Sequence, residues 1–140
     1  MTSRRASGRR RVFVDTSAIV ALLVAGDEAH PAARRAFERL QATDAALVTT
    51  SYVLIETYAL LGRRIGMQAV ADFRERFAPL LEIVWVDAAI HENALDALLA
   101  DGRSDLSLVD AASFLVARQQ QVDAVFAFDG HFEAAGFALV

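Results

Sequence analysis

The chain has 140 residues, of which 55% are hydrophobic, and a formal net charge of −4. This length fits one domain with a core of its own. The sequence has no cysteine, which excludes disulfides, thiolate zinc sites and cysteine nucleophiles. No apolar run reaches the length of a membrane span, and no signal-peptide core follows the basic start. We therefore expect a cytoplasmic protein that does not enter the membrane.

Positive charge is concentrated at the start of the chain. All fourteen basic residues are arginines, and five of them fall in the first eleven residues: Arg4, Arg5, Arg9, Arg10 and Arg11. We expect residues 1–11 to be a disordered tail, which either contacts phosphates or is a leader without function. Residues 12–140 then form one folded domain, in which nine arginines face eighteen acidic residues. Such an acidic body suits nucleic acid only if bound metal offsets its charge.

A smaller group of arginines in the folded part could still form a local positive rim for a nucleic acid. These residues are Arg63, Arg64, Arg74, Arg76 and Arg103.

Hydrophobic periodicity predicts alternating strands and helices. In chain order, we expect a strand at 11–15, helices at 16–26 and 30–42, a strand at 45–50, a helix from 51 to Gly62 or Gly66, a helix at 67–79, a strand at 80–87, helices at 88–100 and 107–121, and strands at 122–129 and 136–140. The strands are continuous apolar runs, which is typical of a parallel sheet covered on both faces. The predicted fold class is therefore α/β, with the sheet sandwiched between helices.

Four acidic residues stand alone in these apolar segments: Asp15, Glu56, Asp110 and Asp129. A buried carboxylate costs free energy unless it is paired or holds a metal, and no arginine lies near enough in these segments. Asp15 and Asp129 end predicted strands, and ligands of α/β sheets bind beyond the carboxyl ends of strands. We expect the four acids to share one site for Mg²⁺ or Mn²⁺.

Each acid also has a purely structural interpretation. Asp15 could cap the helix that follows it. Ser107 and Asp110 match a capping box, which can coexist with metal binding. Asp129 belongs to an Asp-Gly turn dipeptide, and Glu56 could pair with a buried arginine elsewhere. Taken together, the four positions indicate a shared site more strongly than any one of them does.

Other chemistries lack their residues. A P-loop, a receiver domain and a haloacid-dehalogenase-type phosphatase each need a lysine, and the chain has none. The G-x-G-x-x-G of a dinucleotide fold is also missing. We expect His30 and His91 at the surface. His131, two residues after Asp129, either lies near the cleft or, as we prefer, is a surface residue in the first turn of a helix. Nothing in the sequence places two histidines together for general acid–base catalysis.

The order of the segments resembles the PIN-domain nucleases, and especially the VapC ribonuclease toxins of bacterial toxin–antitoxin pairs. The resemblance rests on VDTSAIVALL, TTSYVLIETYALL, LSLVDAASFLVAR and FDGHF, and spans about residues 12–137. It implies a PIN-like fold with a parallel five-stranded sheet and Mg²⁺- or Mn²⁺-dependent cleavage of RNA. The metal site implied comprises Asp15, Glu56, Asp110 and Asp129. A homodimer and a VapB-type antitoxin protein are the implied partners.

The resemblance also identifies supporting residues. A serine or threonine near the last acid often supports the site in this family, but Ala127 stands two residues before Asp129. Thr16 or Ser17 could supply the hydroxyl contacts instead. Asp105 resembles an auxiliary acid of some members.

Hard-ion chemistry then supplies a mechanism. One or two bound cations lower the pKa of a water molecule that attacks the phosphodiester in line, which leaves 5′-phosphate and 3′-hydroxyl ends. We expect Asp15 and Asp110 to be the principal ligands, Glu56 to bind directly or through water, and Asp129 to be an outer or second-metal ligand. The alternative is a catalytically weak PIN domain that binds RNA or a protein. DNA or structured RNA also stays open as the substrate.

Overall fold

The structure is a computed structural model that describes residues 8–140. The first seven residues of the expected tail, with Arg4 and Arg5, lie outside the described residues. Two later arginines of that segment contact the body of the protein. Arg9 Nε donates to the backbone oxygen of Asp44 at 2.7 Å, and the backbone nitrogen of Arg11 donates to Asp123 Oδ2 at 2.9 Å.

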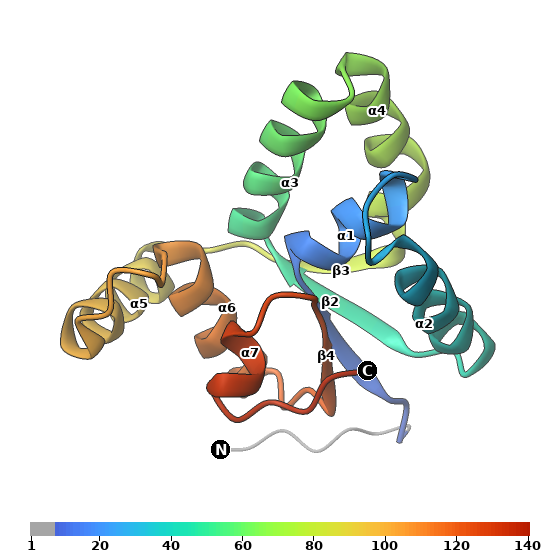
Figure 1. Ribbon diagram of the computed structural model, residues 1–140. Coiled ribbons are helices and arrows are strands. Elements are labelled where there is room, and N and C mark those ends of the chain that lie inside the picture. Colours follow the sequence, from blue (N-terminus) through green and yellow to red (C-terminus); the bar gives the residue numbers. More distant parts are fainter. Residues whose placement is uncertain (1–7) are drawn as a thin grey trace.

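A parallel sheet of four strands occupies the centre of the molecule (Figure 1). Its strands are β1 (Arg11–Val14), β2 (Ala46–Thr50), β3 (Leu81–Val84) and β4 (Ala124–Phe126), and their order across the sheet is β3-β2-β1-β4. All three neighbouring pairs are parallel. The α/β prediction is therefore confirmed.

The expectation of a fifth strand at 136–140 was wrong, because the sheet has four strands. The backbone turns at Gly136, with φ of 97°, and only Leu139 then pairs with β4, through a single parallel bridge to Val125. The predicted strand at 122–129 is likewise reduced to the three residues of β4. These segments are apolar enough for strands, but they pair with the sheet over only part of their length.

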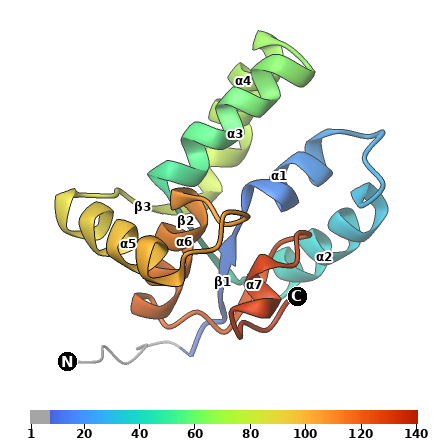
Figure 2. The same ribbon diagram turned by 60° about the vertical axis from the view of Figure 1, so that its left-hand side comes forward.

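Seven α-helices connect and cover the strands. They are α1 (Thr16–Leu23), α2 (His30–Ala42), α3 (Ser51–Arg64), α4 (Met67–Asp72), α5 (Ala88–Asp101), α6 (Leu108–Gln119) and α7 (His131–Ala134), counted over residues 8–140. Helices α1–α4 lie on one side of the sheet and α5–α7 on the other (Figures 1 and 2). None of the described helices is both long and apolar enough to span a membrane.

Two helical segments differ from the expectation. The helix expected at 67–79 is α-helical only through Asp72, and it continues as a π-helical turn (Phe73–Phe77) and a 3₁₀ turn (Ala78–Leu80). Pro79 lacks the N–H group that regular α-helical bonding would require there. A first helical turn was expected at His131, but the short helix α7 was given no bounds, because four residues are too few to show a helical period.

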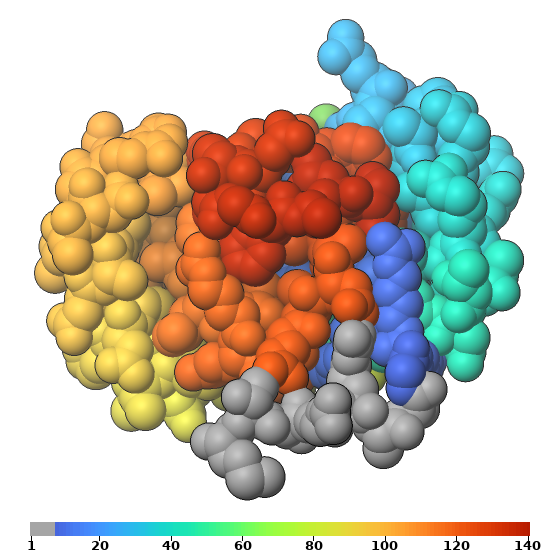
Figure 3. Space-filling view, turned by 90° about the horizontal axis from the view of Figure 1, so that it is seen from below, coloured from blue at the N-terminus to red at the C-terminus, as the bar shows by residue number. Residues whose placement is uncertain are grey.

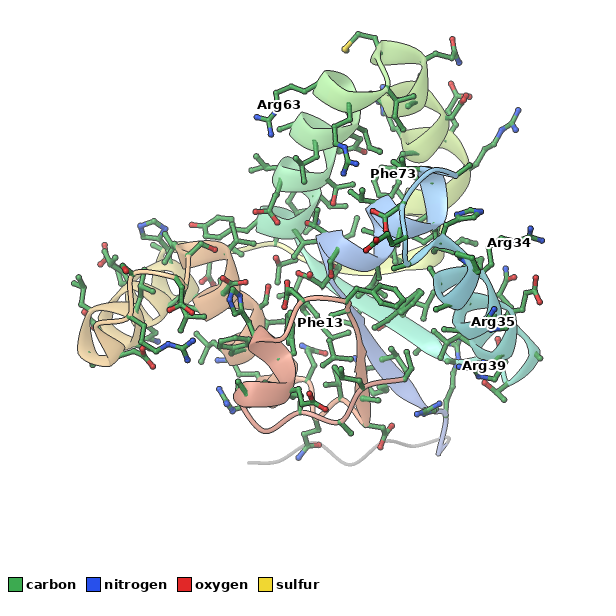
Figure 4. The ribbon with its side chains drawn as sticks, in the orientation of Figure 1. Phe13, Arg34, Arg35, Arg39, Arg63 and Phe73 are labelled. Carbon is green, nitrogen blue, oxygen red and sulfur yellow. The ribbon has the colours of Figure 1, made fainter. Side chains whose placement is uncertain are left out.

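The core lies between the sheet and its two helical layers. Val12, Phe13 and Val14 of β1 are fully buried, and the Phe13 ring lies 5.8 Å from the ring of Phe132 in α7. Phe13 points into the centre of the molecule in Figure 4. Figure 3 shows the segment from β4 to the C-terminus between α5–α6 and β1–α2. Burial of a phenylalanine side chain such as Phe13 or Phe132 stabilises the fold by about 1.5–3 kcal/mol.

The strand order determines where a ligand can bind. The chain runs outward from β1 to β2 and β3, and then returns to place β4 on the other side of β1. The ends of β1 and β4 are therefore the switch point of the sheet, where α/β folds bind their ligands. A hydrogen bond of 3.0 Å from the Asp15 backbone nitrogen to the Phe126 oxygen joins the two strand ends.

Candidate active site

A cavity of about 440 Å³ lies at the carboxyl ends of β1 and β4. The four acids singled out in the sequence all line it: Asp15, Glu56, Asp110 and Asp129. They come from the start of α1, the middle of α3, the first turn of α6 and the loop between β4 and α7. The fold thus brings together four carboxyl groups that lie up to 114 positions apart in the sequence.

Asp15 is the most buried of these groups. Its Oδ2 accepts hydrogen bonds from the Ser17 backbone nitrogen at 3.1 Å and from Ser17 Oγ at 2.7 Å. Burial raises the pKa of Asp15 from 3.8 to about 7; the Ser17 hydrogen bonds oppose this rise, and the nearby charge of Asp129 adds to it. Near neutral pH, this carboxyl is therefore poised to ionise when a cation approaches.

Two hydroxyl side chains hold the start of α1. Ser17 Oγ accepts a 2.9 Å hydrogen bond from the Phe128 backbone nitrogen while it donates to Asp15. Ser17 thereby links Asp15 to the loop that carries Asp129. Ala127, which stands where the family often has a serine or threonine, has no hydroxyl group for such a contact. The Thr16 hydroxyl lies 3.3 Å from the Val53 oxygen and joins α1 to α3. Both hydroxyl residues line the cavity.

The structural interpretations of three acids also hold. Asp15 caps α1 through the Ser17 contacts. Asp110 and Ser107 form a reciprocal capping box, with distances of 3.0 and 3.1 Å. Asp129 Oδ1 accepts from the backbone nitrogen of His131 at 3.1 Å. These hydrogen bonds fix the directions of the carboxyl groups, so capping and a shared site coexist.

Glu56 differs from the other three acids. It is half-buried on α3, and its side chain makes no hydrogen bond or ion pair with any residue among 8–140. The interpretation that a buried arginine explains Glu56 therefore finds no partner in the described part of the chain. Its side chain is available to a ligand in the cavity.

Asp105 lies outside the residues that line the cavity. Arg103 donates to its two carboxylate oxygens at 3.1 and 2.6 Å, and these hydrogen bonds hold the pKa of Asp105 below its usual value. Asp105 Oδ2 is also 3.8 Å from Nε2 of His131. Asp105 therefore reaches the site only through this histidine.

The surface placement expected for the histidines was wrong, since all three are half-buried. His131 lines the cavity, and its Nδ1 is 3.4 Å from Asp110 Oδ2. His30 is half-buried, with its Nδ1 2.8 Å from the Ala21 oxygen, and His91 is half-buried against the hydroxyl of Tyr52. Each contact joins segments whose packing the sequence does not reveal. The proximity of His131 to Asp129 in the sequence was the one available signal.

Two other charged residues line the cavity and were not placed there from the sequence. Asp27 follows α1, where its Oδ1 accepts from the Ala29 backbone nitrogen at 2.9 Å. Arg64 lies at the end of α3, and of the five arginines expected to form a rim it alone lines this cavity. Arg103 is paired with Asp105, and Arg63 projects outward from α3 (Figure 4).

The donor groups fit a hard divalent cation. Ligand atoms of Asp110, Asp129 and His131 lie within 4.8 Å of one another. The pKa of Asp15 is raised partly by the negative charge of Asp129. A bound cation would neutralise these mutually repelling carboxylates, and Mg²⁺ and Mn²⁺ prefer such oxygen donors. The arrangement is thus an acidic cluster of the kind that binds metal.

Comparisons with known proteins agree with this geometry. The family model of the PIN domain matches residues 12–138. The 23S rRNA-specific endonuclease VapC20 of Mycobacterium tuberculosis is 38% identical over 130 residues, which cover 92% of this chain and 97% of that protein.

Two solved structures share the fold. The crystal structure of the M. tuberculosis VapC20, described as a sarcin–ricin loop cleaving toxin, superposes with a TM-score of 0.80 and 39% identity over 92% of this chain and 98% of that one. FitAcB from Neisseria gonorrhoeae gives a TM-score of 0.66 at 16% identity over 91% and 95% of the two chains, and supports the fold alone. The chain belongs to the PIN-domain family, and within it to the VapC-type endoribonuclease toxins.

Proposed function

We propose that this endoribonuclease cleaves 23S ribosomal RNA in the sarcin–ricin loop, with Mg²⁺ or Mn²⁺ held by Asp15, Glu56, Asp110 and Asp129. The observation that carries the catalytic part is the cavity where these four carboxyl groups meet, one of them buried with a pKa of about 7. The choice of RNA is supported by the 38% identity to VapC20 over nearly the whole of both chains.

Each carboxyl group has a role in this proposal. Asp15 and Asp110 are the principal ligands, because Ser17 and Ser107 fix their orientation by hydrogen bonds. Glu56 binds directly or through water, and Asp129 completes the cluster. When bound, the cation supplies an activated water and offsets the negative charge of the phosphate. The protein's own groups orient the phosphodiester so that the products are a 5′-phosphate and a 3′-hydroxyl.

Arg64 is the residue that we assign to the RNA backbone. It is exposed, it lines the cavity, and its side chain makes no hydrogen bond or ion pair with any residue among 8–140. A guanidinium beside an acidic cluster can hold a phosphate that would otherwise be repelled. The neighbouring Arg63 projects outward from the same helix (Figure 4) and is outside the cavity lining.

A catalytically weak domain that only binds RNA or a protein is the less favoured function. Such a scaffold has no need to keep four carboxyl groups around one cavity, with the unfavourable burial of Asp15 among them. The hydroxyl group that Ala127 lacks is supplied from another direction by Ser17. The site therefore retains the polar groups that hydrolysis needs.

Partners follow from the VapC-type assignment. We propose a VapB-type antitoxin, a homodimer and a cytoplasmic location, where ribosomal RNA is found.

An apolar groove of about 610 Å³ between α1, α2 and α4 offers a docking surface for an apolar segment of the antitoxin. Leu23, Ile65 and Leu80 line this groove and are 39%, 49% and 50% exposed. Ile65→Asp should weaken antitoxin binding and leave RNA cleavage intact.

The substrate is tested by incubating purified bacterial ribosomes and protein-free 23S rRNA with the wild type and Asp15→Asn in Mg²⁺ or Mn²⁺. Primer extension then maps every new 5′ end. A single cut in the sarcin–ricin loop that Asp15→Asn does not produce is the expected result. Metal-dependent cuts confined to another RNA would overturn the substrate assignment but not the nuclease. Binding of the loop without any cut would instead favour the scaffold.

A further inference from the structure

His131 has a position that neither the four-acid site nor a structural role explains. It begins α7, two residues after Asp129, and its backbone nitrogen donates to Asp129 Oδ1 at 3.1 Å. Its side chain lines the cavity, where Nδ1 lies 3.4 Å from Asp110 Oδ2. His131 therefore meets two of the proposed ligands, Asp129 through its backbone nitrogen and Asp110 through its ring.

The nitrogen that faces the acids lacks a hydrogen-bond partner. Among residues 8–140, Nδ1 of His131 is a buried polar atom without a hydrogen bond. It is near enough to Asp110 Oδ2 for an ion pair, but the two groups are not aligned for a hydrogen bond. Asp110 Oδ2 is already occupied by Ser107, through the backbone nitrogen at 3.0 Å and Oγ at 3.2 Å. A buried polar atom of this kind costs free energy unless a ligand satisfies it.

The distances fit coordination to one ion. One ligand atom each of Asp110, Asp129 and His131 lies within 4.8 Å of the other two. Donors that share one cation at bond lengths of roughly 2.1 Å lie about 3–4 Å apart, so a small adjustment brings the three together.

The other ring nitrogen has the environment of a metal-binding histidine. Nε2 of His131 is 3.8 Å from Asp105 Oδ2, and Asp105 is held from the opposite side by two hydrogen bonds from Arg103. Histidines that bind metals commonly direct their second nitrogen to a carboxylate, which fixes the orientation of the ring. Asp105 and Arg103 thus support the ring from outside the cavity.

We propose that His131 donates Nδ1 as a nitrogen ligand to the metal ion held by Asp110 and Asp129, with Asp105 as the residue that positions the ring. This proposal rests on the proposed metal site and adds a donor beyond its four acids. A mixed oxygen and nitrogen site favours Mn²⁺ over Mg²⁺, because imidazole suits transition metals better than it suits Mg²⁺. Mn²⁺ is therefore the preferred ion of this chain.

The test is pulsed EPR of Mn²⁺ bound to the full-length protein, which detects nitrogen in direct contact with the ion. The chain has three histidines, so the matched variants are His131→Gln and His91→Gln, the latter lying outside the cavity. We expect a directly bound nitrogen in the wild type and in His91→Gln, and its loss in His131→Gln. Labelling the wild type with ¹⁵N-histidine must change the coupling between Mn²⁺ and the nitrogen. This measurement tests for a histidine ligand without any substitution.

Titration provides a second measurement. His131→Gln should weaken Mn²⁺ about 10-fold or more and leave Mg²⁺ affinity within about 2-fold. Asp105→Asn should keep the nitrogen coupling but weaken Mn²⁺. If Mn²⁺ binds with affinity that depends on Asp15 but shows no nitrogen coupling, the inference is overturned and the proposed nuclease site stands. If no Mn²⁺ binds at millimolar concentration, both fall.

Discussion

The Ser17 hydroxyl lies 2.7 Å from Asp15 Oδ2 and at the same time accepts a 2.9 Å hydrogen bond from the Phe128 backbone nitrogen. One side chain therefore connects the acid after β1 to the loop after β4. Since these loops carry Asp15 and Asp129, this contact sets the geometry of the switch point.

Replacing Ser17 by alanine should impair the site more than the fold. The change leaves the Phe128 nitrogen without its acceptor and lets Asp15 reorient. We therefore expect a loss of about 1–2 kcal/mol in unfolding free energy and about a 10-fold fall in kcat. Urea denaturation and RNA-cleavage kinetics measure the two effects. Ser113→Ala is the matched control, because the buried Ser113 hydroxyl has no hydrogen-bond partner in the described part of the chain. It should be neutral or stabilising; equal losses in both variants would contradict this role of Ser17.

Asp15→Asn should stabilise the metal-free protein while it abolishes cleavage. The folded pKa of about 7 exceeds the unfolded value of 3.8, so the folded state binds more protons between these values. Stability from this group is thus complete below about pH 3.8 and is lost as pH rises toward 7. We expect the Asp15→Asn variant to gain roughly 2–4 kcal/mol over wild type at pH 8 in chelator, and little at pH 4.

The control for this comparison is Asp96→Asn, which changes an exposed position on α5. Urea denaturation at several pH values should show no pH-dependent gain for it. A constant difference between wild type and Asp15→Asn across the pH range would rule out the buried carboxyl as its origin.

Metal affinity should rise with pH up to about 7. Below that value Asp15 is largely protonated, and a cation must displace its proton before the carboxylate can bind. The apparent affinity for Mn²⁺ should therefore increase up to about tenfold per pH unit and then level off. Calorimetry in buffers of different ionisation enthalpy counts the released proton. Binding that releases no proton at pH 6 would show that Asp15 is not a ligand.

Arg64→Gln should weaken RNA binding without changing metal affinity. Arg64 lines the cavity, and its guanidinium can neutralise one phosphate. We expect KM for RNA to rise about 5–10-fold. The slope of the logarithm of the binding constant against the logarithm of the salt concentration should become shallower by about one, since one phosphate contact is lost. Arg63→Gln, which changes the neighbouring residue on the outer side of α3 (Figure 4), should behave as wild type. Equal effects would indicate general charge rather than a contact at the site.

The sequence predicted the order of the elements well, because apolar periodicity and turn residues are local properties. The helix expected at 30–42 has the same bounds as α2. The sheet was overestimated by one strand, since pairing of residues 136–140 depends on how the chain turns at Gly136 and not on apolar content. Helix α7 was expected only as a first turn at His131, because it is too short for a periodic signal.

The difference between local sequence properties and tertiary packing also decides which site residues could be predicted. Asp15, Glu56, Asp110 and Asp129 could be found because a lone acid in an apolar segment violates a local pattern. His131 and Arg64 lie in polar or mixed segments where nothing is violated, and only the packing of α7 and the direction of α3 bring them to the cavity. The only sequence signals for them were weak: the closeness of His131 to Asp129, and the presence of Arg64 in the expected arginine rim.

The central claim, that the four acids form a metal-dependent ribonuclease site, is tested most directly by RNA cleavage with purified wild type and Asp15→Asn. Each protein is incubated with a mixed RNA pool in Mg²⁺, in Mn²⁺ and with chelator. Cleavage by the wild type alone, in metal alone, is the predicted result. Equal cleavage by both proteins, or cleavage that persists in chelator, would contradict it.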